Sequence, residues 1–555
     1  MHHCNNKISG KKLYLIQIHA LQLFVYIVFG IFYVYLIDKS MLSNDYRVRG
    51  AAYGDLPFHI NIVTSFAYGT NNIRNGLYDI NSSFYANEKL AYPIITNFFT
   101  GALMGTGKST LRIALFLPSA LIFLSLLIGI YSLSFYLTRS YLSAALSVFL
   151  FTNLGGLGWI RLFNPKHGYG DWAHNWGNKR FEYWFHPLFH VLIPQRASLY
   201  SMPLCYWSIL ILLIGIKDFD WKMFFAAGIF VGFTPLVQLH SYVALAQYAI
   251  VLCIITFPYR NKKIYFKAIK AWVIFGVVAN VMAFPQLLLF LGRLNNNKEF
   301  CRFKSISKIR KVSFFKLWWN ALGVFAVIAL SLGLVLLNRK QIIAYIPSLF
   351  VFTTSNLIIY QPWELDNLKL FYAAWIPVAL PIVSQYLVAL TKQKYMLMIS
   401  FLLIFASSLS SIIYSIDCLT SNPQLFDKWK EDLGYWIAEN TPKKAVFLTS
   451  SDHNIPITTF GGRQTLLGYG GWLSSHGIKN YHERRNEVNK IMSNPNQTEL
   501  IKKYNITYLV WESSKKTKLK EYDHRIWQCI YSNNRYAVMK KRKNELNLNF
   551  YPNKN

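Results

Sequence analysis

Long apolar stretches recur from one end of this 555-residue chain to the other, and they decide what it can fold into. A helix crosses the bilayer core with about 20 apolar residues, and a charge at its centre costs roughly 2.5–3.5 kcal/mol. The stretches from Phe371 to Leu390 and from Tyr395 to Ile416 contain no charge at all. The sequence therefore predicts a polytopic α-helical membrane protein with about eleven spans. The expected spans are residues 13–37, 112–137, 140–153, 199–216, 221–238, 240–258, 268–291, 318–337, 342–359, 370–390 and 395–416.

Lysine and arginine gather at the N-terminus and in every second short loop between these stretches. The residues are Lys7, Lys11, Lys12, Arg139, Lys217, Lys222, Arg260, Lys262, Lys263, Lys267, Arg339, Lys340, Lys392 and Lys394. The positive-inside rule places them in the cytoplasm. Residues 38–110 and 418–555 then lie on the opposite side, and so do the three N-x-S/T sequons at Asn81, Asn496 and Asn505. The expected membrane is that of the endoplasmic reticulum in a eukaryote and the plasma membrane in a prokaryote.

The net charge of +33 is compatible in principle with nucleic acid or with membrane. The cations are spread over loops between spans, which favours anionic lipid head groups and argues against a nucleic-acid partner. One basic loop, residues 293–316, lies on the far side, against the charge bias. Its arginines include Arg293 and Arg302. Two interpretations stay open: the loop grips a phosphate or pyrophosphate, or it is a solvated surface segment.

Two domains are expected. Residues 1–417 form a transmembrane domain whose first external loop, 38–110, is unusually large. Residues 418–555 follow the last span and are long enough for a core of their own. Within them, an amphipathic helix at 423–440 precedes a strand at 445–449, a helix at 479–492 and a strand at 506–511. This alternation predicts a small extramembrane α/β domain with a polar tail.

Motifs for metals and nucleotides are weak. The six cysteines form no C-x-x-C pair, and His186 and His190 lack the glutamate of a zinc-protease motif. The run Gly105-Thr106-Gly107-Lys108 resembles a phosphate loop but has Ala102 where the first glycine is required. No metal site and no nucleotide site are predicted.

The first external loop carries an acid in apolar surroundings. In Gly54-Asp55-Leu56-Pro57-Phe58-His59, Asp55 and His59 are spaced i, i+4, so one helical turn puts them on the same face. A capping acid with a surface histidine is the plainer interpretation. Against it, an acid among apolar residues near the bilayer is costly unless it has a task. Asp55 and His59 are therefore candidate catalytic residues.

Three further short segments lie on the same predicted side. Glu88 and Lys89 end the first loop, Arg196 follows Pro-Gln just before a span, and Glu364 and Asp366 precede the tenth span. External loops can converge over the helices, so these residues are expected near the candidate acid. Glu88, Glu364 and Asp366 are possible accessory groups.

In layout and motifs the chain resembles the GT-C superfamily of membrane glycosyltransferases, whose sugar donor is a polyprenyl-phosphate lipid. The likeness covers most of the chain: an acid after the first span, a Lys-x-x-Tyr-Pro-like stretch, about eleven spans and a C-terminal external domain. The family's catalytic aspartate corresponds to Asp55 and its loop lysine to Lys89. Protein O-mannosyltransferases carry Asp-Glu where this chain has Asp55-Leu56. The Trp-Trp-Asp signature of oligosaccharyltransferase is absent, so the resemblance leaves donor and acceptor open.

The resemblance implies transfer of a sugar from a polyprenyl-phosphate lipid to an acceptor on the luminal or extracytoplasmic side. Asp55 would act as the base. Lys89, Arg196, Arg293 and Arg302 would hold the donor phosphate. The expected partners are the sugar lipid, membrane lipids and an acceptor that is a protein, lipid or glycan. The leaving phosphate is already ionised, so no cofactor is required, although a divalent cation is compatible.

Other classes of function remain as alternatives. A lipid or solute transporter, or a scramblase, predicts intramembrane charges along a path and internal repeats, and the spans have neither. A non-catalytic membrane subunit of a glycosylation complex is the third alternative.

Overall fold

The computed structural model describes residues 22–542 except 25, 51, 77–78, 164–185, 297–299, 479 and 513–522. Contacts within the chain divide it into two compact units. The membrane unit comprises Met1–Leu56, Ala91–Thr100 and Ser109–Leu425, and the C-terminal unit comprises Pro57–Leu90, Gly101–Lys108 and Phe426–Asn555.

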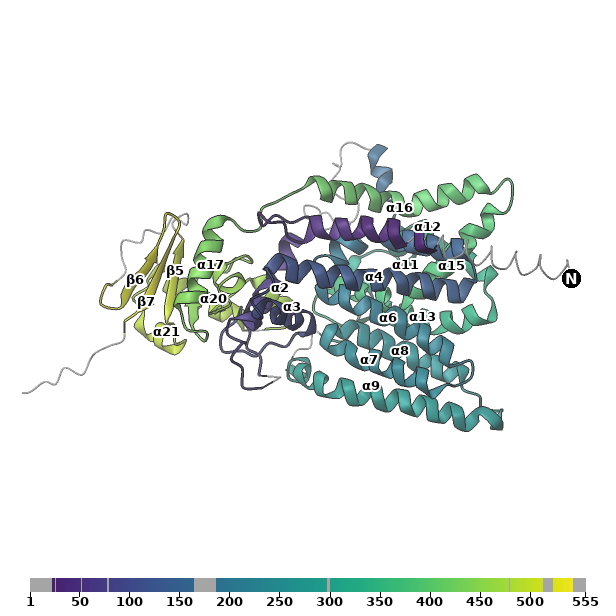
Figure 1. The fold of residues 1–555 in the computed structure, drawn as a ribbon, viewed down its shortest axis with the longest axis horizontal. Helices are drawn as coiled ribbons and strands as arrows, with labels where there is room; N and C mark the ends of the chain where they lie inside the picture. Colours follow the sequence, from purple (N-terminus) through teal and green to yellow (C-terminus); the bar gives the residue numbers. More distant parts are fainter. Residues whose placement is uncertain are drawn as a thin grey trace, which may run out of the picture. The chain divides into compact units, whose positions relative to one another are not determined.

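The membrane unit is built of long apolar helices (Figure 1). In the described part of the chain, seven helical stretches are long and apolar enough to cross a membrane. They are Gln22–Met41, α4 (Leu111–Thr138), α6 (Arg196–Gly215), α8 (Leu239–Thr256), Lys262–Leu288 of α9 (Lys262–Asn296), Glu364–Thr391 and α16 (Leu397–Thr420). Two shorter apolar helices are α5 (Tyr141–Thr152) and α7 (Trp221–Val237). The chain is thus a multi-pass integral membrane protein, as expected.

The eleven expected spans are not all continuous long helices. The stretch 342–359 corresponds to α13 (Arg339–Leu357), and 370–390 continues through η6 (Phe371–Trp375) into α15 (Ile376–Thr391). The stretch 318–337 is broken into α11 (Phe314–Leu322), α12 (Val324–Leu330) and η4 (Leu332–Leu336). The first break falls at Gly323, whose φ of 52° ends a right-handed helix. The total of eleven stays a prediction.

Small and hydroxyl side chains bring the helices together. In α7, Gly228 and Gly232 form a G-x-x-x-G pattern that packs against α9. A Cβ at Gly232 would lie 2.7 Å from the carbonyl oxygen of Ala279, so only glycine permits this approach. Between α5 and α15, the Ser147 hydroxyl donates to the Ser384 hydroxyl over 2.9 Å. Such contacts replace the hydrophobic effect, which gives little drive between helices inside lipid.

The C-terminal unit contains a five-stranded sheet in the order β4-β3-β5-β7-β6. Strands β3 (Val446–Leu448), β4 (Gln464–Thr465) and β5 (Tyr508–Glu512) are parallel, whereas β7 (Tyr536–Lys541) runs antiparallel to β5 and β6 (Trp527–Ser532). The helices are α17 (Lys428–Asn440), α18 (Pro456–Thr459), α19 (Gly470–Ser475), α20 (Tyr481–Ser493) and α21 (Thr498–Lys503). The predicted small sheet domain is therefore present.

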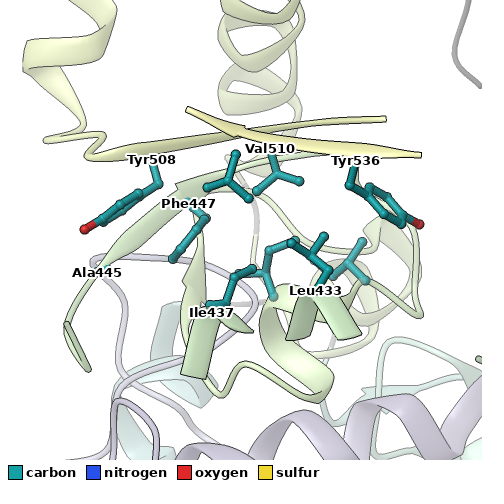
Figure 2. Close-up of a cluster of buried hydrophobic side chains, with 10 residues drawn as sticks. Leu433, Ile437, Ala445, Phe447, Tyr508, Val510 and Tyr536 are labelled. Carbon is teal, nitrogen blue, oxygen red and sulfur yellow. The ribbon is translucent and has the colours of Figure 1, made fainter. Parts of the chain in front are cut away.

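One apolar face of α17 covers this sheet. Leu433 and Ile437, both fully buried, lie below Phe447 and Val510 in Figure 2 and belong to the same apolar cluster. Their spacing of four residues places them on one side of the helix. The helix expected at 423–440 begins at Lys428, and Leu433 and Ile437 form its buried apolar face.

Two parts of the large first loop fold with the C-terminal residues. The backbone at 83–86 pairs beside β4: Thr465 N–H donates to the Ser83 carbonyl over 2.8 Å, and Ala86 N–H donates to the Thr465 carbonyl over 3.0 Å. At Gly69, a Cβ would lie 2.0 Å from the Gly462 carbonyl oxygen, so glycine is required. Residues 57–90 and 101–108 thus belong to the C-terminal unit, although the sequence groups the whole loop with the transmembrane domain.

Two helices run from one unit into the other. Helix α2 (Ala52–Ala67) starts in the membrane unit with Asp55 in its first turn and passes into the C-terminal unit at Pro57. Helix α3 (Ile95–Gly105) makes the same passage after Thr100.

Candidate active site

Asp55 lies in a polar cluster of the membrane unit. Its carboxylate accepts a hydrogen bond from the Gln195 side chain. Asp55 is partly buried, and the loss of water around its carboxyl group raises its pKa to about 6; the positive charge of Lys369 acts against the rise and the negative charge of Asp366 adds to it. A carboxyl group of this pKa is mostly ionised at pH 7, yet it is more basic than an ordinary aspartate.

Arg196 follows Gln195 and begins helix α6. Its side chain has no exposed surface. The Nη2 atom donates to the Thr100 hydroxyl over 2.8 Å and to the Tyr200 hydroxyl over 3.3 Å. Within the described residues, Nε and Nη1 have no hydrogen-bond partner. A buried cation in this state is costly until an anion reaches it.

Asp366 and Lys369 form a largely buried ion pair. The Lys369 Nζ lies 2.7 Å from Asp366 Oδ1, and their side chains are 13% and 11% exposed. The neighbouring Asn367 fixes this segment, because its amide nitrogen donates to the carbonyls of Ser355 and Ile358 over 2.9 and 2.6 Å. The first turns of the helical stretch Glu364–Thr391 thus present a carboxylate and an ammonium group at a defined position.

Tyr92 completes the cluster. Burial raises the pKa of its phenol first, and the negative charges of Asp55 and Asp366 raise it further. The phenol therefore stays protonated and can donate a hydrogen bond at neutral pH. Four segments that are distant in sequence thus meet around the Asp55 carboxylate. They are the start of α2, the Tyr-Pro stretch, the Pro-Gln-Arg turn and the segment before residue 370.

The predicted arginines of the basic loop are placed differently from Arg196. Arg302 Nη2 donates to the backbone carbonyls at 361–362 over 3.2 and 3.0 Å. Arg310 Nη2 lies 3.4 Å from Glu364 Oε1. These contacts anchor the basic segment to the loop that bears Glu364 and Asp366. Arg293 lies in α9, and its side chain is outside the described residues.

Three predicted residues belong to the C-terminal unit, whereas Asp55 belongs to the membrane unit. His59 is buried on α2, with 2% of its surface exposed. Lys89 forms an ion pair with Asp79. Glu88 is exposed. The interactions given for these residues lie within their own unit, and the grouping of His59, Lys89 and Glu88 with Asp55 stays a prediction.

The likeness to solved structures covers most of the chain. Neither the known protein-family models nor the curated protein sequences match it. The oligosaccharyltransferase of Archaeoglobus fulgidus, in complex with Zn and sulfate, superposes with a TM-score of 0.54 at 12% identity, covering 88% of this chain and 68% of that one. The same enzyme, named AglB, in complex with an inhibitory peptide and a dolichol-phosphate, gives 0.51 at 11% identity, covering 88% and 69%. The arabinofuranosyltransferase AftD from Mycobacteria gives 0.50 at 11% identity, covering 87% of this chain and 36% of that one. The chain has the GT-C fold.

The resemblance expected from the sequence is thereby confirmed for the fold. Asp55 lies in the first turn of α2, after the first apolar helix. The sequence did not single out Tyr92, Gln195 or Lys369 as site residues. Tyr92 was visible only as part of the Tyr-Pro stretch, and Lys369 only as a lone cation at the edge of an apolar run.

No group of three or more His, Cys, Asp or Glu side chains in the described part of the chain could hold a metal ion. The Lys369 ammonium lies on the Asp366 carboxylate, where a cation would otherwise bind. His240 is close to this pair, with its Nδ1 3.4 Å from the Gln361 amide nitrogen. An internal cation thus neutralises the second acid.

Proposed function

We propose that this chain is a membrane glycosyltransferase that moves a sugar from a polyprenyl-phosphate lipid to an acceptor hydroxyl on the luminal or extracytoplasmic side. The observation that carries the proposal is Arg196: a buried guanidinium with two unpartnered nitrogens, one residue from the side chain that binds Asp55. A phosphate fits it because guanidinium and phosphate pair through parallel charge-assisted hydrogen bonds. Dolichol-phosphate in the complex of the A. fulgidus enzyme supports a polyprenyl-phosphate ligand.

The chemistry assigns one task to each group. The acceptor oxygen attacks the anomeric carbon of the donor sugar and forms the new glycosidic bond, while its proton passes to the Asp55 carboxylate. The bond between the anomeric carbon and the phosphate oxygen breaks, and the electron pair leaves with the phosphate. Arg196 stabilises the charge that grows on that oxygen. Gln195 holds the carboxylate in place, and the Asp366–Lys369 pair tunes its basicity.

The other predicted phosphate-binding residues and the topology fit the same reaction. Arg302 and the basic loop would attract the lipid phosphate from the membrane surface, and Lys89 would support it. The reaction needs no cofactor, since the leaving phosphate is already ionised, and a divalent cation is compatible. The basic short loops support a cytoplasmic N-terminus and an extracytoplasmic C-terminal unit.

Purified full-length protein in lipid nanodiscs, supplied with a panel of radiolabelled polyprenyl-phosphate sugars, tests the proposal. We expect one donor to lose its sugar to an acceptor or to water, and Asp55→Asn to abolish this loss. No turnover of any donor would refute the enzyme. Lipid scrambling in liposomes that persists in Asp55→Asn would favour the scramblase alternative instead.

A further inference from the structure

A cleft of about 550 Å³ lies in the C-terminal unit at the carboxyl ends of β3 and β5. These neighbouring strands are parallel, and β3 connects through α18 to β4 on its other side. The chain therefore leaves β3 away from β5 and opens a crevice between the two strand ends. Parallel sheets bind ligands at such points of diverging connections. The volume lies within the usual range of ligand sites, about 300–1,000 Å³.

The lining of the cleft is rich in short polar side chains. After β3 come Thr449, Ser450, Ser451, Asp452 and Asn454, and α20 adds Asn489 and Ser493. Hydroxyl and amide groups both donate and accept hydrogen bonds, and a carboxylate accepts from several donors. The Ser450 hydroxyl donates to Asp452 Oδ2 over 2.9 Å, which orients the carboxylate. This set suits a ligand that carries many hydroxyl groups.

The charges of the cleft balance. Arg535 is shared between Asp427 and Glu512, with Nη1 2.5 Å from Asp427 Oδ2 and Nη2 3.2 Å from Glu512 Oε1. Among the lining residues, Lys430 and Arg535 offset Asp452 and Glu512. Within the cleft a phosphate or nucleotide would find no spare guanidinium, since Arg535 is already committed. The guanidinium of the adjoining hollow, Arg485, lies over the Tyr481 ring at 5.0 Å from its centroid. The balance favours an uncharged polar ligand.

An open hollow of about 510 Å³ adjoins this cleft and shares Ser451 and Asp452 with it. Tyr469 lines the hollow and keeps 43% of its surface exposed, beside Gly470 and Gly471. A Cβ at Gly471 would lie 2.5 Å from the Tyr469 ring, so glycine lets the ring lie against this backbone. Aromatic faces carry negative charge and attract the positive C–H edges of a sugar ring. A flat ring thus stands next to a hydroxyl-binding cleft.

We infer that the cleft and the hollow together bind a carbohydrate chain, with one sugar ring on Tyr469 and hydroxyl groups on Asp452 and its neighbours. The bound chain is the acceptor, an assignment that rests on the proposed glycosyltransferase activity. Tethering an acceptor glycan to the polypeptide that carries Asp55 raises its effective concentration for transfer.

Binding is tested on the full-length protein in nanodiscs by saturation-transfer NMR. The probes are four tetrasaccharides, built from glucose, mannose, galactose and N-acetylglucosamine. We expect at least one to bind, and Asp452→Asn and Tyr469→Ala each to weaken it at least tenfold. The matched controls are Asp432→Asn and Tyr435→Ala, whose side chains are exposed in the same unit but do not line the cleft, and they should bind as wild type does.

The outcomes separate this inference from the proposed function. If the protein binds a tetrasaccharide but turns over no lipid donor, the inferred carbohydrate site is supported and the transferase is refuted. If the wild type transfers sugar, and Asp452→Asn raises the KM for the acceptor without changing hydrolysis of the donor, the result supports both the carbohydrate site and the transferase. The inference is overturned when no tetrasaccharide binds, or when both cleft variants bind like the controls.

Discussion

Replacing Asp55 by asparagine should inactivate the protein and stabilise it at the same time. Burial raises the pKa of this carboxyl from 3.8 to about 6. Each pKa unit corresponds to about 1.36 kcal/mol, so ionised Asp55 destabilises the fold by about 3 kcal/mol at pH 7. Asparagine keeps the shape and the hydrogen bond with Gln195 but has no charge. The variant should regain most of that free energy and lose activity at least about a hundredfold.

The stability gained in Asp55→Asn should depend on pH. Because the folded pKa is the higher one, the contribution of Asp55 to stability is fully present below pH 3.8 and is lost as pH rises through about 6. Thermal unfolding of the detergent-solubilised protein should show a gain for Asp55→Asn at pH 7 and about half that gain in free energy at pH 5. In the wild type, kcat/KM should fall below pH 6 as the base is protonated.

Asp79 provides the control. Hydrogen bonding and the charge of Lys89 lower the pKa of its carboxyl, so Asp79→Asn should bring no gain in stability at pH 7 and little change in activity. The reasoning about Asp55 would be refuted by an active Asp55→Asn enzyme, or by one that unfolds at a lower temperature than wild type at pH 7.

Three more predictions follow from buried or exposed single residues. Arg196→Met should raise the KM for the lipid donor at least tenfold, without lowering the unfolding temperature of the donor-free protein. The control, Arg463→Met, should lower the unfolding temperature by several degrees, because the Arg463 guanidinium donates to backbone carbonyls over 2.6–2.9 Å. The opposite pattern would remove Arg196 from the donor site. Gly69→Ala should destabilise the C-terminal unit by at least about 2 kcal/mol, seen as earlier proteolysis, since its Cβ would clash with a backbone carbonyl. A single cysteine at exposed Glu88 should react with an impermeant maleimide from the extracytoplasmic side, and labelling from the cytoplasm would reverse the topology.

Local chemistry explains which parts of the site could be predicted. Asp55 stood out because an acid in an apolar stretch is costly, and Arg196 because it directly precedes a span. Both lie in the cluster that the structure assembles. Lys369 did not stand out, since one cation at the edge of an apolar run is typical of any membrane protein. Its role depends on the ion pair with Asp366 and on the approach of Tyr92, which no local pattern encodes.

The fold was predictable to a similar degree. Hydropathy identified the helical segments and the apolar face of α17, because burial repeats along the sequence. It missed the break at Gly323, where the residue composition is that of an ordinary span and only the positive φ ends the helix. It also missed the part of the C-terminal unit that comes from the first external loop, residues 57–90 and 101–108. The pairing of residues 83–86 with Thr465 joins segments hundreds of residues apart, and such contacts leave no periodic signal.

The discontinuous C-terminal unit has a consequence for biosynthesis. Residues 57–90 and 101–108 are translated first, but their partners begin only at Phe426, roughly 320 residues later. At about 5–20 residues per second, the early segments wait between about 15 and 60 s. During that time Ile60, Ile62 and Val63 of α2, fully buried in the finished fold, have no complete core to enter. The nascent chain therefore needs a chaperone or the membrane surface to shield its first loop until translation nears its end.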